Sequence, residues 1–249
     1  MPLIDLNDSW ALVTGGATRI GAAISVELAE AGCNTIVHYR TNKCGALQTA
    51  DRVRETGRKA IVLQANLADR REMHSLAQRV SETVETRSRG LGVLVHNAAN
   101  FERVDPSMLS ESALDNALSL NAEAPYALTI ALAKILKASQ GSVVAIGCTS
   151  AFRPLRNYVP YSISKAALHH VVSGLALALA PEVRVNAVAP GMIHRPNGFD
   201  ETNLRRIASE IPLRRFGDPG DVSRAVRFLA ENNYITGQVI VIDGGRVLT

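Results

Sequence analysis

The stretch WALVTGGATRIG, residues 10–21, decides how this chain folds. Its first five residues have the length and apolar composition of a buried strand. Gly15 and Gly16 leave the end of that strand free of side chains, and a run of helical period follows over residues 19–31. Gly21 lets the helix pack closely against the strand. A strand, a glycine turn and a helix in this order offer backbone amides and the positive end of a helix dipole to a pyrophosphate.

The same alternation of apolar runs and helical periods continues through all 249 residues, and no linker or repeat divides it. Seven strand-like runs separated by helices predict an α/β fold with a parallel, doubly wound sheet and helices on both faces. The expected strands are residues 10–14, 34–39, 59–64, 91–96, 141–147, 183–190 and 238–245. The expected helices are residues 19–31, a polar segment ending near 55, then 69–86, 112–137, 161–180 and 221–230.

Composition narrows the classes of function. Hydrophobic residues make up 47% of the chain and aromatic residues only 4%, which suits an aliphatic core around a parallel sheet. The net charge of +4 is modest and the arginines are not interleaved with aromatics, so we expect no nucleic-acid partner. The longest apolar run, within residues 171–180, is too short for a bilayer, so we expect no membrane. Three cysteines without metal-ligand spacing predict no metal site and a reducing, cytoplasmic location.

The loop after the second expected strand carries cations and no carboxylate. Ligands of such sheets bind beyond the carboxyl ends of the strands, and an NAD site would place an acidic residue here. No Asp or Glu occurs over residues 33–50. His38, Arg40 and Thr41 suit a ribose phosphate instead, and Arg19 adds a guanidinium from the glycine turn. A merely solvated surface would explain the cations but not the missing carboxylate, so the loop predicts NADPH/NADP as the cofactor.

Tyr161 and Lys165 form the candidate acid-base pair. They lie four residues apart in a run that has the pattern of a buried helix, so both side chains project from one face. An ammonium beside a phenol stabilises the phenolate, so we expect Lys165 to lower the pKa of Tyr161 and make it a usable proton donor. Alone, this spacing also fits an ordinary amphipathic helix.

Two further segments have the character of a binding site. After the fourth expected strand, Asn97, Ala98 and Ala99 are compact where a cofactor would pass, and Asn97 can bond backbone groups that lack partners there. Phe101 offers a flat apolar surface to a planar ligand, or is a core side chain. Asn121 is polar in an apolar helical stretch, and is either a satisfied core amide or the holder of a water beside the catalytic lysine.

Over almost its whole length the chain resembles the short-chain dehydrogenase/reductase family. The resemblance implies a single NAD(P)-binding Rossmann domain over residues 1–249 and hydride transfer with Tyr161 as acid. It also implies that Lys165 holds the nicotinamide ribose and that Asn121 completes a proton relay through water. The matching motifs are Thr14-Gly15…Gly21, Asn97-Ala98-Ala99, Asn121, Tyr161-x-x-x-Lys165, Pro190-Gly191 and Ile242-Asp243-Gly244-Gly245. The implied cofactor contacts are Gly15, Arg19, Ile20, Gly21, His38, Arg40, Thr41, Asn66, Leu67, Asn97, Ala98, Ala99, Tyr161, Lys165, Pro190, Gly191 and Ile193.

Within that family the chain resembles the pteridine reductase branch, including the dihydromonapterin reductases. Arg19 stands where most members have glycine, Phe101 follows the Asn-Ala motif, RPLRNYVPY leads to the tyrosine, and the C-terminal motif is Asp-Gly-Gly-Arg. The resemblance implies that Arg19 contacts cofactor phosphate and pterin, that Phe101 stacks on the pterin, and that Tyr158 lines the pocket. We therefore predict an NADPH-dependent reductase of a pteridine, with Tyr161 as proton donor and as a substrate contact.

Cys148 departs from the family pattern. Thirteen residues before the tyrosine, the family usually has a serine and the pteridine reductases have an aspartate. A thiol is a weak hydrogen-bond donor and replaces neither residue well. Cys148 is assigned to the catalytic and substrate sets, with Thr149 as the alternative if the loop shifts by one residue. If no hydroxyl stands at this position, the site lacks its third group. That would point to slow turnover, an unusual substrate or a ring imine that needs protonation more than carbonyl polarisation.

Residues 192–219 mix Gly and Pro with a short helical piece and are predicted to form a substrate-binding loop or lid. Their arginines either meet an anionic substrate or form a solvated face. Two other functions stay open: a ketone or 3-oxoacyl reductase of the same family, and a weakly catalytic NADP-binding regulatory protein. We expect a small-molecule substrate and a homotetramer, or a homodimer, assembled through residues 124–136, 159–179 and 239–247.

Overall fold

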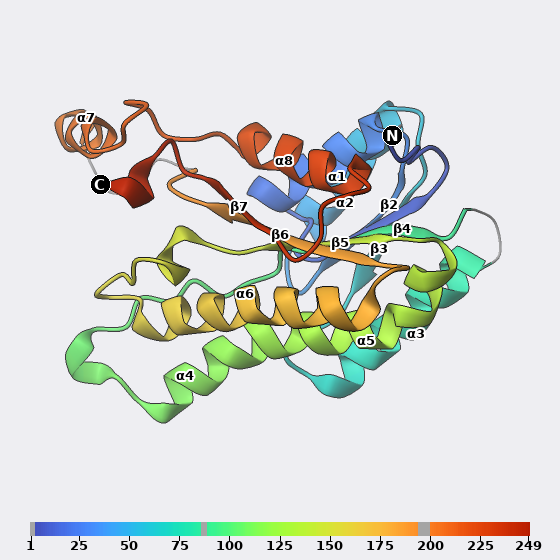
Figure 1. The fold of residues 1–249 in the computed structure, drawn as a ribbon, viewed down its shortest axis with the longest axis horizontal. Helices are drawn as coiled ribbons and strands as arrows, with labels where there is room; N and C mark the ends of the chain where they lie inside the picture. Colours follow the sequence, from blue (N-terminus) through green and yellow to red (C-terminus); the bar gives the residue numbers. More distant parts are fainter. Residues whose placement is uncertain (1–2, 86–88, 194–199) are drawn as a thin grey trace.

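The computed structural model describes residues 3–85, 89–193 and 200–249. One sheet of seven parallel strands has the order β3-β2-β1-β4-β5-β6-β7 (Figure 1). The strands are β1 (Trp10–Val13), β2 (Asn34–Tyr39), β3 (Ala60–Gln64), β4 (Leu91–His96), β5 (Ser142–Ile146), β6 (Arg184–Pro190) and β7 (Val239–Ile242). The predicted doubly wound sheet is confirmed.

The helices lie in two layers, one on each face of the sheet (Figure 1). On one face, α1 packs between α2 and α8; on the other, α5 packs against α3 and α6, and α4 packs against α6. The α-helices are α1 (Arg19–Glu30), α2 (Lys43–Glu55), α3 (Arg70–Glu85), α4 (Glu111–Leu118), α5 (Ala124–Ala138), α6 (Val159–Leu179), α7 (Glu201–Ser209) and α8 (Pro219–Glu231).

Successive strand residues alternate between two cores. Leu12 and Leu94 belong to the cluster on the side of α3, α5 and α6, whereas Val13 and Val95 belong to the cluster on the side of α1 and α8. All four side chains are fully buried. Because helices cover both faces, the central strands are apolar at nearly every position, which explains why the sequence shows continuous aliphatic runs there.

The expected helix over residues 112–137 is interrupted. The structure has α4, a π-helical turn at Ser119–Glu123 and then α5. Asn121 lies in this turn, buried, and exchanges hydrogen bonds with the backbone of Asn100. A π-turn admits one extra residue into the helix and commonly occurs at functional sites. Residue periodicity does not reveal it, because one extra residue in a single turn barely changes the helical pattern of an apolar stretch.

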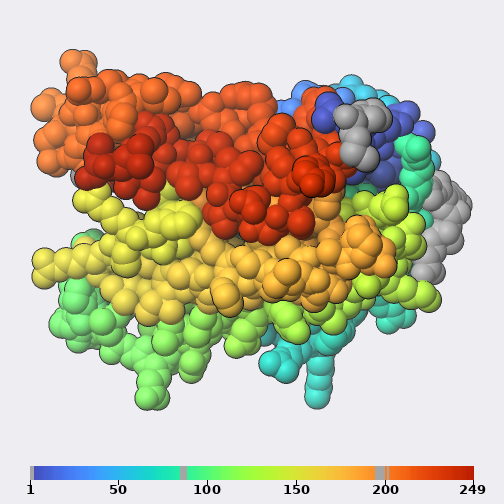
Figure 2. All heavy atoms as spheres, in the orientation of Figure 1, coloured from blue at the N-terminus to red at the C-terminus, as the bar shows by residue number. Residues whose placement is uncertain are grey.

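Helix α6 is longer than the apolar run that the sequence suggested. Among the described residues, it is the one helix that could cross a membrane, by its length of 21 residues and its apolar composition alone. Its inner side, including Leu168 and Val172, is buried in the core against β6 and α5. Its outer side exposes Ile163 and Leu177 and forms part of the band across the middle of Figure 2. These contacts are those of a core helix with one open side.

The central strand β4 gives a test of the sheet core. Leu94→Ala should lower the free energy of unfolding by about 2 to 5 kcal/mol, because it leaves a cavity between β4 and the helices beneath it. Leu177→Ala removes the same atoms from a side chain that is 85% exposed, and should change stability by less than about 0.5 kcal/mol. Urea unfolding of both variants measures the difference, and equal losses would contradict this core.

Candidate active site

The turn after β1 is held to the end of β4 by two side chains. The Thr14 hydroxyl donates to the Val95 carbonyl and accepts from the backbone N–H groups of Asn97 and Ala98, at 2.9 and 3.1 Å. The Asn97 amide donates to the carbonyls of Thr14 and Gly15, each at 3.0 Å. The expectation that Asn97 bonds otherwise unpaired backbone is confirmed. These bonds tie together the two strands at which the sheet order reverses.

Gly21 is required by the close approach of the turn to helix α1. A Cβ at this position would lie 2.2 Å from the Gly15 carbonyl oxygen and 2.5 Å from the Asn97 amide nitrogen. Thr18, the residue before the helix, makes no side-chain cap to the first turn. The first amides of α1 therefore face outward without a side-chain acceptor, which is the arrangement that binds phosphate groups at helix N-termini.

Exposed cations surround this turn. The charged groups of Arg19, Arg40 and Lys43 have no ion-pair or hydrogen-bond partner among the residues that the structure describes. Gly45, in the first turn of α2, approaches so closely that a Cβ would lie 2.6 Å from the Ala17 carbonyl oxygen, which brings the two loops together. Arg19 has a φ of 51°, a left-handed conformation that a glycine would adopt at lower cost. A cation held in a disfavoured backbone conformation makes Arg19 a candidate functional residue, and its contact with a cofactor phosphate stays a prediction.

His38 has a different role from the one expected. It is buried, with Nδ1 accepting from the Gly15 N–H and Nε2 bonded to the Ala65 carbonyl, both at 3.1 Å. Burial lowers the pKa of His38 to about 4, so the ring is neutral near pH 7. The expectation of a cation at the ribose phosphate is therefore wrong for His38. Its neutral ring supports the glycine turn from beneath.

Most of the other residues expected to contact the cofactor lie at the ends of the strands or in the turns that follow them. They are Thr41 after β2, Asn66 and Leu67 after β3, Ala99 after β4, and Pro190, Gly191 and Ile193 at and after β6, together with Ile20 in the first turn of α1. Direct contact with a cofactor stays a prediction for all of them. Residues 194–199 of the expected substrate loop lie outside the described residues, and Arg195 is among them.

Lys165 is buried beneath the end of β5. Its side chain is 2% exposed, and Nζ donates to the Ile146 carbonyl at 2.7 Å. Nζ lies 5.7 Å from the centroid of the Tyr161 ring, so the helix brings the two side chains together as expected. Burial lowers the pKa of Lys165 to about 8, which leaves most of it protonated at neutral pH.

The pKa of Tyr161 is raised, not lowered as expected. The main cause is burial of the phenol, and the second is the neighbouring Cys148 thiol. The expectation counted the attraction of Lys165 for a phenolate but not the cost of burying that anion. Tyr161 therefore stays protonated across neutral pH, which is the state that a proton donor needs.

Cys148, not Thr149, lies against the Tyr161 phenol. The Cys148 sulfur accepts from the Ser150 N–H at 3.4 Å and is close enough to Tyr161 to raise its pKa. The Thr149 hydroxyl donates to the Pro190 carbonyl at 3.4 Å instead. The thiol therefore occupies the position beside the acid, and the one-residue shift toward Thr149 does not occur in this structure.

Asn121 is a satisfied buried amide joined to helix α6, which carries Tyr161 and Lys165. Its Nδ2 donates to the Ser164 hydroxyl at 2.9 Å and to the Asn100 carbonyl, and its Oδ1 accepts from the Asn100 N–H. Ser164 in turn donates to the Tyr161 carbonyl at 2.7 Å. Asn121 thus fixes the first turns of α6, and its part in a proton relay stays a prediction.

Phe101 lies between two tyrosines. Its ring stacks on Tyr158 at 4.2 Å between centroids and 8° between planes, and meets Tyr161 edge-on at 4.8 Å. The three rings expected to contact substrate are thus together. The face of Phe101 that stacks on Tyr158 has no room for a planar ligand at this separation, since a ring stacked between them needs about 7 Å. Phe101 is 58% exposed, so its other surface is open.

Two histidines near Lys165 were not anticipated. His96 is buried at the end of β4 with Nε2 bonded to the Thr129 hydroxyl at 2.7 Å. His169 lies one turn after Lys165 on α6, a spacing that the sequence does display. Burial and then the charge of Lys165 lower the pKa values of His96 and His169 to about 3 and about 4. Of the three basic side chains Lys165, His96 and His169, Lys165 is therefore the one that carries a positive charge near neutral pH.

This geometry defines a class of nicotinamide-dependent oxidoreductases, in which a glycine turn follows the first strand of a Rossmann sheet and a buried tyrosine and lysine lie one turn apart on a helix. The chain belongs to the short-chain dehydrogenase/reductase family. The family model described as "Enoyl-(Acyl carrier protein) reductase" matches residues 15–246.

Its relatives differ in the substrates that their names give. The chain is 34% identical to the 3-oxoacyl-(acyl-carrier-protein) reductase FabG of Aggregatibacter actinomycetemcomitans, over 94% of this chain and 97% of the relative. It is 29% identical to the dihydromonapterin reductase of Klebsiella pneumoniae subsp. pneumoniae, over 95% of this chain and 96% of that one. The structure of FolM alternative dihydrofolate reductase 1 from Brucella canis, complexed with NADP, matches with a TM-score of 0.88 at 32% identity, covering 98% and 96% of the two chains.

The buried histidines predict an acid-side loss of stability. His38 and His96 have folded pKa values near 4 and 3, whereas an unfolded histidine titrates near 6.5. Between these values the unfolded chain binds more protons, so the free energy of unfolding should fall as pH drops from about 6.5 toward 4. Replacing one histidine removes about 1.4 kcal/mol per pH unit from that slope.

His96→Gln is the variant that measures this slope. Urea unfolding at several pH values from 4 to 7 should give a shallower dependence than in the parent protein. The exposed His74, on the surface of α3, provides the matched control His74→Gln, which should leave the slope unchanged. Identical slopes for the parent and His96→Gln would show that His96 is not held neutral.

Proposed function

We propose that this NADP-dependent reductase of the short-chain family reduces a dihydropterin-type ring, with Tyr161 donating the proton. The observation that carries the proposal is the aromatic cluster in which Phe101 and Tyr158 lie beside Tyr161. An exposed aromatic surface next to the acid suits a flat heteroaromatic substrate. Arg19, held in a left-handed conformation at the glycine turn, adds a cation for the cofactor phosphate and the pterin.

The residues around the glycine turn fit NADP. The uncapped N-terminus of α1 suits the pyrophosphate, and the unpaired Arg19 and Arg40 suit the ribose phosphate. Lys165 would hold the nicotinamide ribose. When bound, NADPH supplies the hydride.

The side chains of the site supply the proton and its control. The raised pKa of Tyr161 keeps the phenol protonated until a substrate atom accepts the proton. Lys165 is protonated and lies 5.7 Å from that ring, so it stabilises the negative charge that the phenolate carries after the proton has left. Asn121 and Ser164 hold the turn of α6 from which both residues project.

Cys148 favours a ring imine over a ketone as the group reduced. A ketone gains from a strong second donor at its oxygen, and a thiol is a weak one. An imine nitrogen needs chiefly a proton, which Tyr161 provides. The second candidate, a ketone or 3-oxoacyl reductase, is favoured by the likeness to the 3-oxoacyl reductase of Aggregatibacter.

The substrate assignment is tested by following NADPH oxidation. Dihydromonapterin and dihydrobiopterin should be reduced with at least tenfold higher kcat/KM than simple ketones or a 3-oxoacyl thioester. Tyr161→Phe should lower turnover by about 10²- to 10⁴-fold while NADPH affinity changes little, because only the transferable proton is removed. A preference for the ketones or the thioester would establish the second candidate. NADPH binding without oxidation of any substrate would favour the weakly catalytic regulatory protein.

Arg40→Asp tests the cofactor preference. The substitution places a carboxylate against the ribose phosphate, so NADPH affinity should fall by about ten- to hundredfold while NADH affinity falls little or rises. Arg52→Asp, the same charge change on the exposed side of α2 far from its first turn, is the control. Fluorescence titration of both nucleotides gives the affinities, and an equal loss of both would overturn the role of Arg40.

The remaining proposals concern assembly, boundaries and location. We expect a cytoplasmic protein, a single functional unit over residues 1–249 with residues 192–219 at the substrate, and a homotetramer or homodimer. The exposed side of α6, with Leu177 85% exposed, and the half-buried strand β7 are apolar surfaces that suit such an assembly.

A further inference from the structure

A cavity of about 500 Å³ lies between helix α7 and the start of α8. We call it the arginine pocket. Its apolar floor is made by Ile193 and Leu204, which are 6% and 8% exposed. Three guanidinium side chains also line it, those of Arg205, Arg214 and Arg215. This pocket is separate from the aromatic cluster and the glycine turn described above.

The three arginines differ in their partners. Arg215 donates to the Asp221 carboxylate at 2.9 Å, and Asp221 is shared with Arg224. The guanidinium groups of Arg205 and Arg214 have no hydrogen-bond or ion-pair partner within the described part of the chain. Asp218 is the acidic residue on the pocket wall, and its carboxylate accepts from the Gly220 N–H. The pocket therefore carries more cationic charge than its own acidic residues neutralise.

Arg214 is held in a strained backbone conformation. Its φ of 56° is in the left-handed region, where glycine is the favoured residue and a side chain is disfavoured. The strain is not offset by a bond of its guanidinium to the rest of the described protein. Strained residues that persist in binding loops indicate a role for the side chain that they carry.

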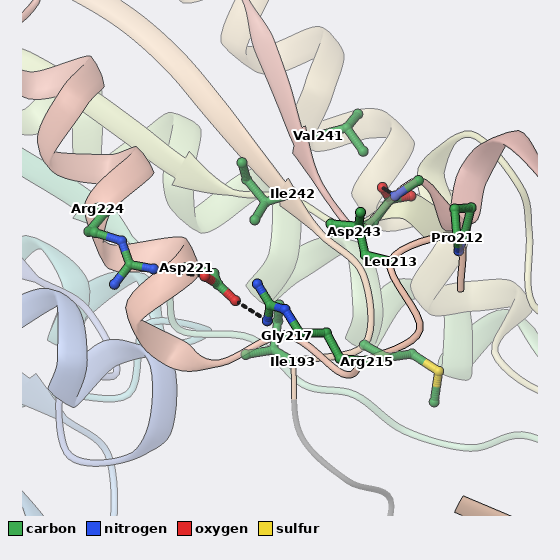
Figure 3. A pocket seen from close by; sticks show the side chains of 13 residues that line it. Ile193, Pro212, Leu213, Arg215, Gly217, Asp221, Arg224, Val241, Ile242 and Asp243 are labelled. Atoms are coloured by element: carbon green, nitrogen blue, oxygen red, sulfur yellow. Dashed lines mark hydrogen bonds and ion pairs between the residues drawn. The ribbon is translucent and has the colours of Figure 1, made fainter. Parts of the chain in front are cut away.

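A second cavity of about 570 Å³ adjoins the arginine pocket and is lined mainly by apolar side chains. The two share Ile193, Arg215 and Gly217. Figure 3 shows the second cavity, with the Arg215–Asp221 ion pair at one side and Ile193, Ile242, Leu213 and Pro212 around it. A ligand that fills both would have an apolar part followed by an anionic end.

Both cavities begin close to the catalytic loops. Ile193 lies three residues after Pro190, whose carbonyl accepts from the hydroxyl of Thr149 beside Cys148. Met192, between them, lines the apolar cavity. A substrate whose reactive end lies at Tyr161 would reach the arginines past Met192 and Ile193, which line these cavities.

We propose that Arg205 and Arg214 form a subsite for the anionic end, a carboxylate or a phosphate, of an extended substrate whose apolar middle lies in the adjoining cavity. The subsite sorts substrates by their tails, and it does so whichever group is reduced at Tyr161. Two guanidinium groups facing one cavity suit a group with two or more acceptor oxygens.

The test uses direct binding to the NADP-saturated protein, so that neither turnover nor the cofactor phosphates enter the result. Isothermal titration compares 4-aminobenzoyl-L-glutamate with its dimethyl ester, and 4′-phosphopantetheine with pantetheine. Each pair differs only in the anionic group. The charged member of at least one pair should bind at least tenfold more tightly than its neutral partner, and the pair that responds distinguishes a carboxylate from a phosphate.

Arg205→Gln with Arg214→Gly is the informative variant. It should weaken binding of the charged probe at least tenfold and leave the neutral probe unchanged. Arg214→Gly alone should not lower the melting temperature, because glycine relieves the left-handed strain. Arg206→Gln is the matched control, since Arg206 lies next in α7, pairs with Glu210 and does not line the pocket.

Three results would overturn the subsite. They are equal affinity of the charged and neutral probes, unchanged affinity of the charged probe in the double variant, and no binding of either charged probe to the parent protein. If the pterins are not reduced but the charged probes bind as expected, only the proposed pterin substrate is refuted. If the pterins are reduced but the charged probes show no preference, only the subsite for the anionic end is refuted.

Discussion

The bonds from Thr14 and Asn97 hold together the two strand ends on which the site is built. β1 and β4 are neighbours in the sheet but lie far apart in the chain, and the loops after them run in opposite directions across the sheet edge. Beyond the last ladder bond, from the Thr14 N–H to the Val95 carbonyl, the backbone groups of these loops need other partners. One hydroxyl and one amide supply partners for those groups, at the place where a doubly wound sheet has its ligand crevice. The glycine turn follows β1, the basic loop follows β2, and Lys165 on α6 bonds the end of β5, so all three lie at the carboxyl edge of the sheet.

Desolvation sets the charge states around the crevice. Burial acts in opposite directions on an acid and a base, so it raises the pKa of Tyr161 and lowers the pKa of Lys165. It also keeps His96 and His169 neutral beside that lysine. The result is one buried ammonium, one protonated phenol and two uncharged rings. Such a set keeps the phenol protonated near neutral pH, and the ammonium of Lys165 is the charge at hand to stabilise the phenolate that donation leaves.

The sequence predicted the parts of the fold that depend on short-range pattern. Residues 34–39 and 91–96 were assigned to strands with the bounds that the structure has, because fully buried parallel strands are continuous aliphatic runs. The motif residues also came to one sheet edge, since topology brings the strand ends together. The order of the motifs along the chain therefore contained most of the site.

What the sequence did not predict depends on contacts between segments that are distant in the chain. In the π-turn, the Asn121 amide bonds Asn100 and Ser164, which are 21 and 43 residues away in the chain. The neutral state of His38 follows from its burial between Gly15 and Ala65, and a basic loop pattern points the other way. The direction of the Tyr161 pKa shift likewise depends on the balance of burial against charge, which residue spacing does not contain.

The position of Cys148 beside Tyr161 affects which chemical group the site can reduce. Thr149 in the loop that carries it donates to the Pro190 carbonyl at the end of β6, and Cys148 accepts from the Ser150 N–H within the same loop. Exchanging the thiol for the neighbouring hydroxyl would break the bond to Pro190. The reacting group of the substrate therefore meets one strong donor, Tyr161, and one weak donor. A substrate that is activated by protonation at a single atom loses little at such a site, whereas a carbonyl loses the second hydrogen bond that would stabilise its developing charge.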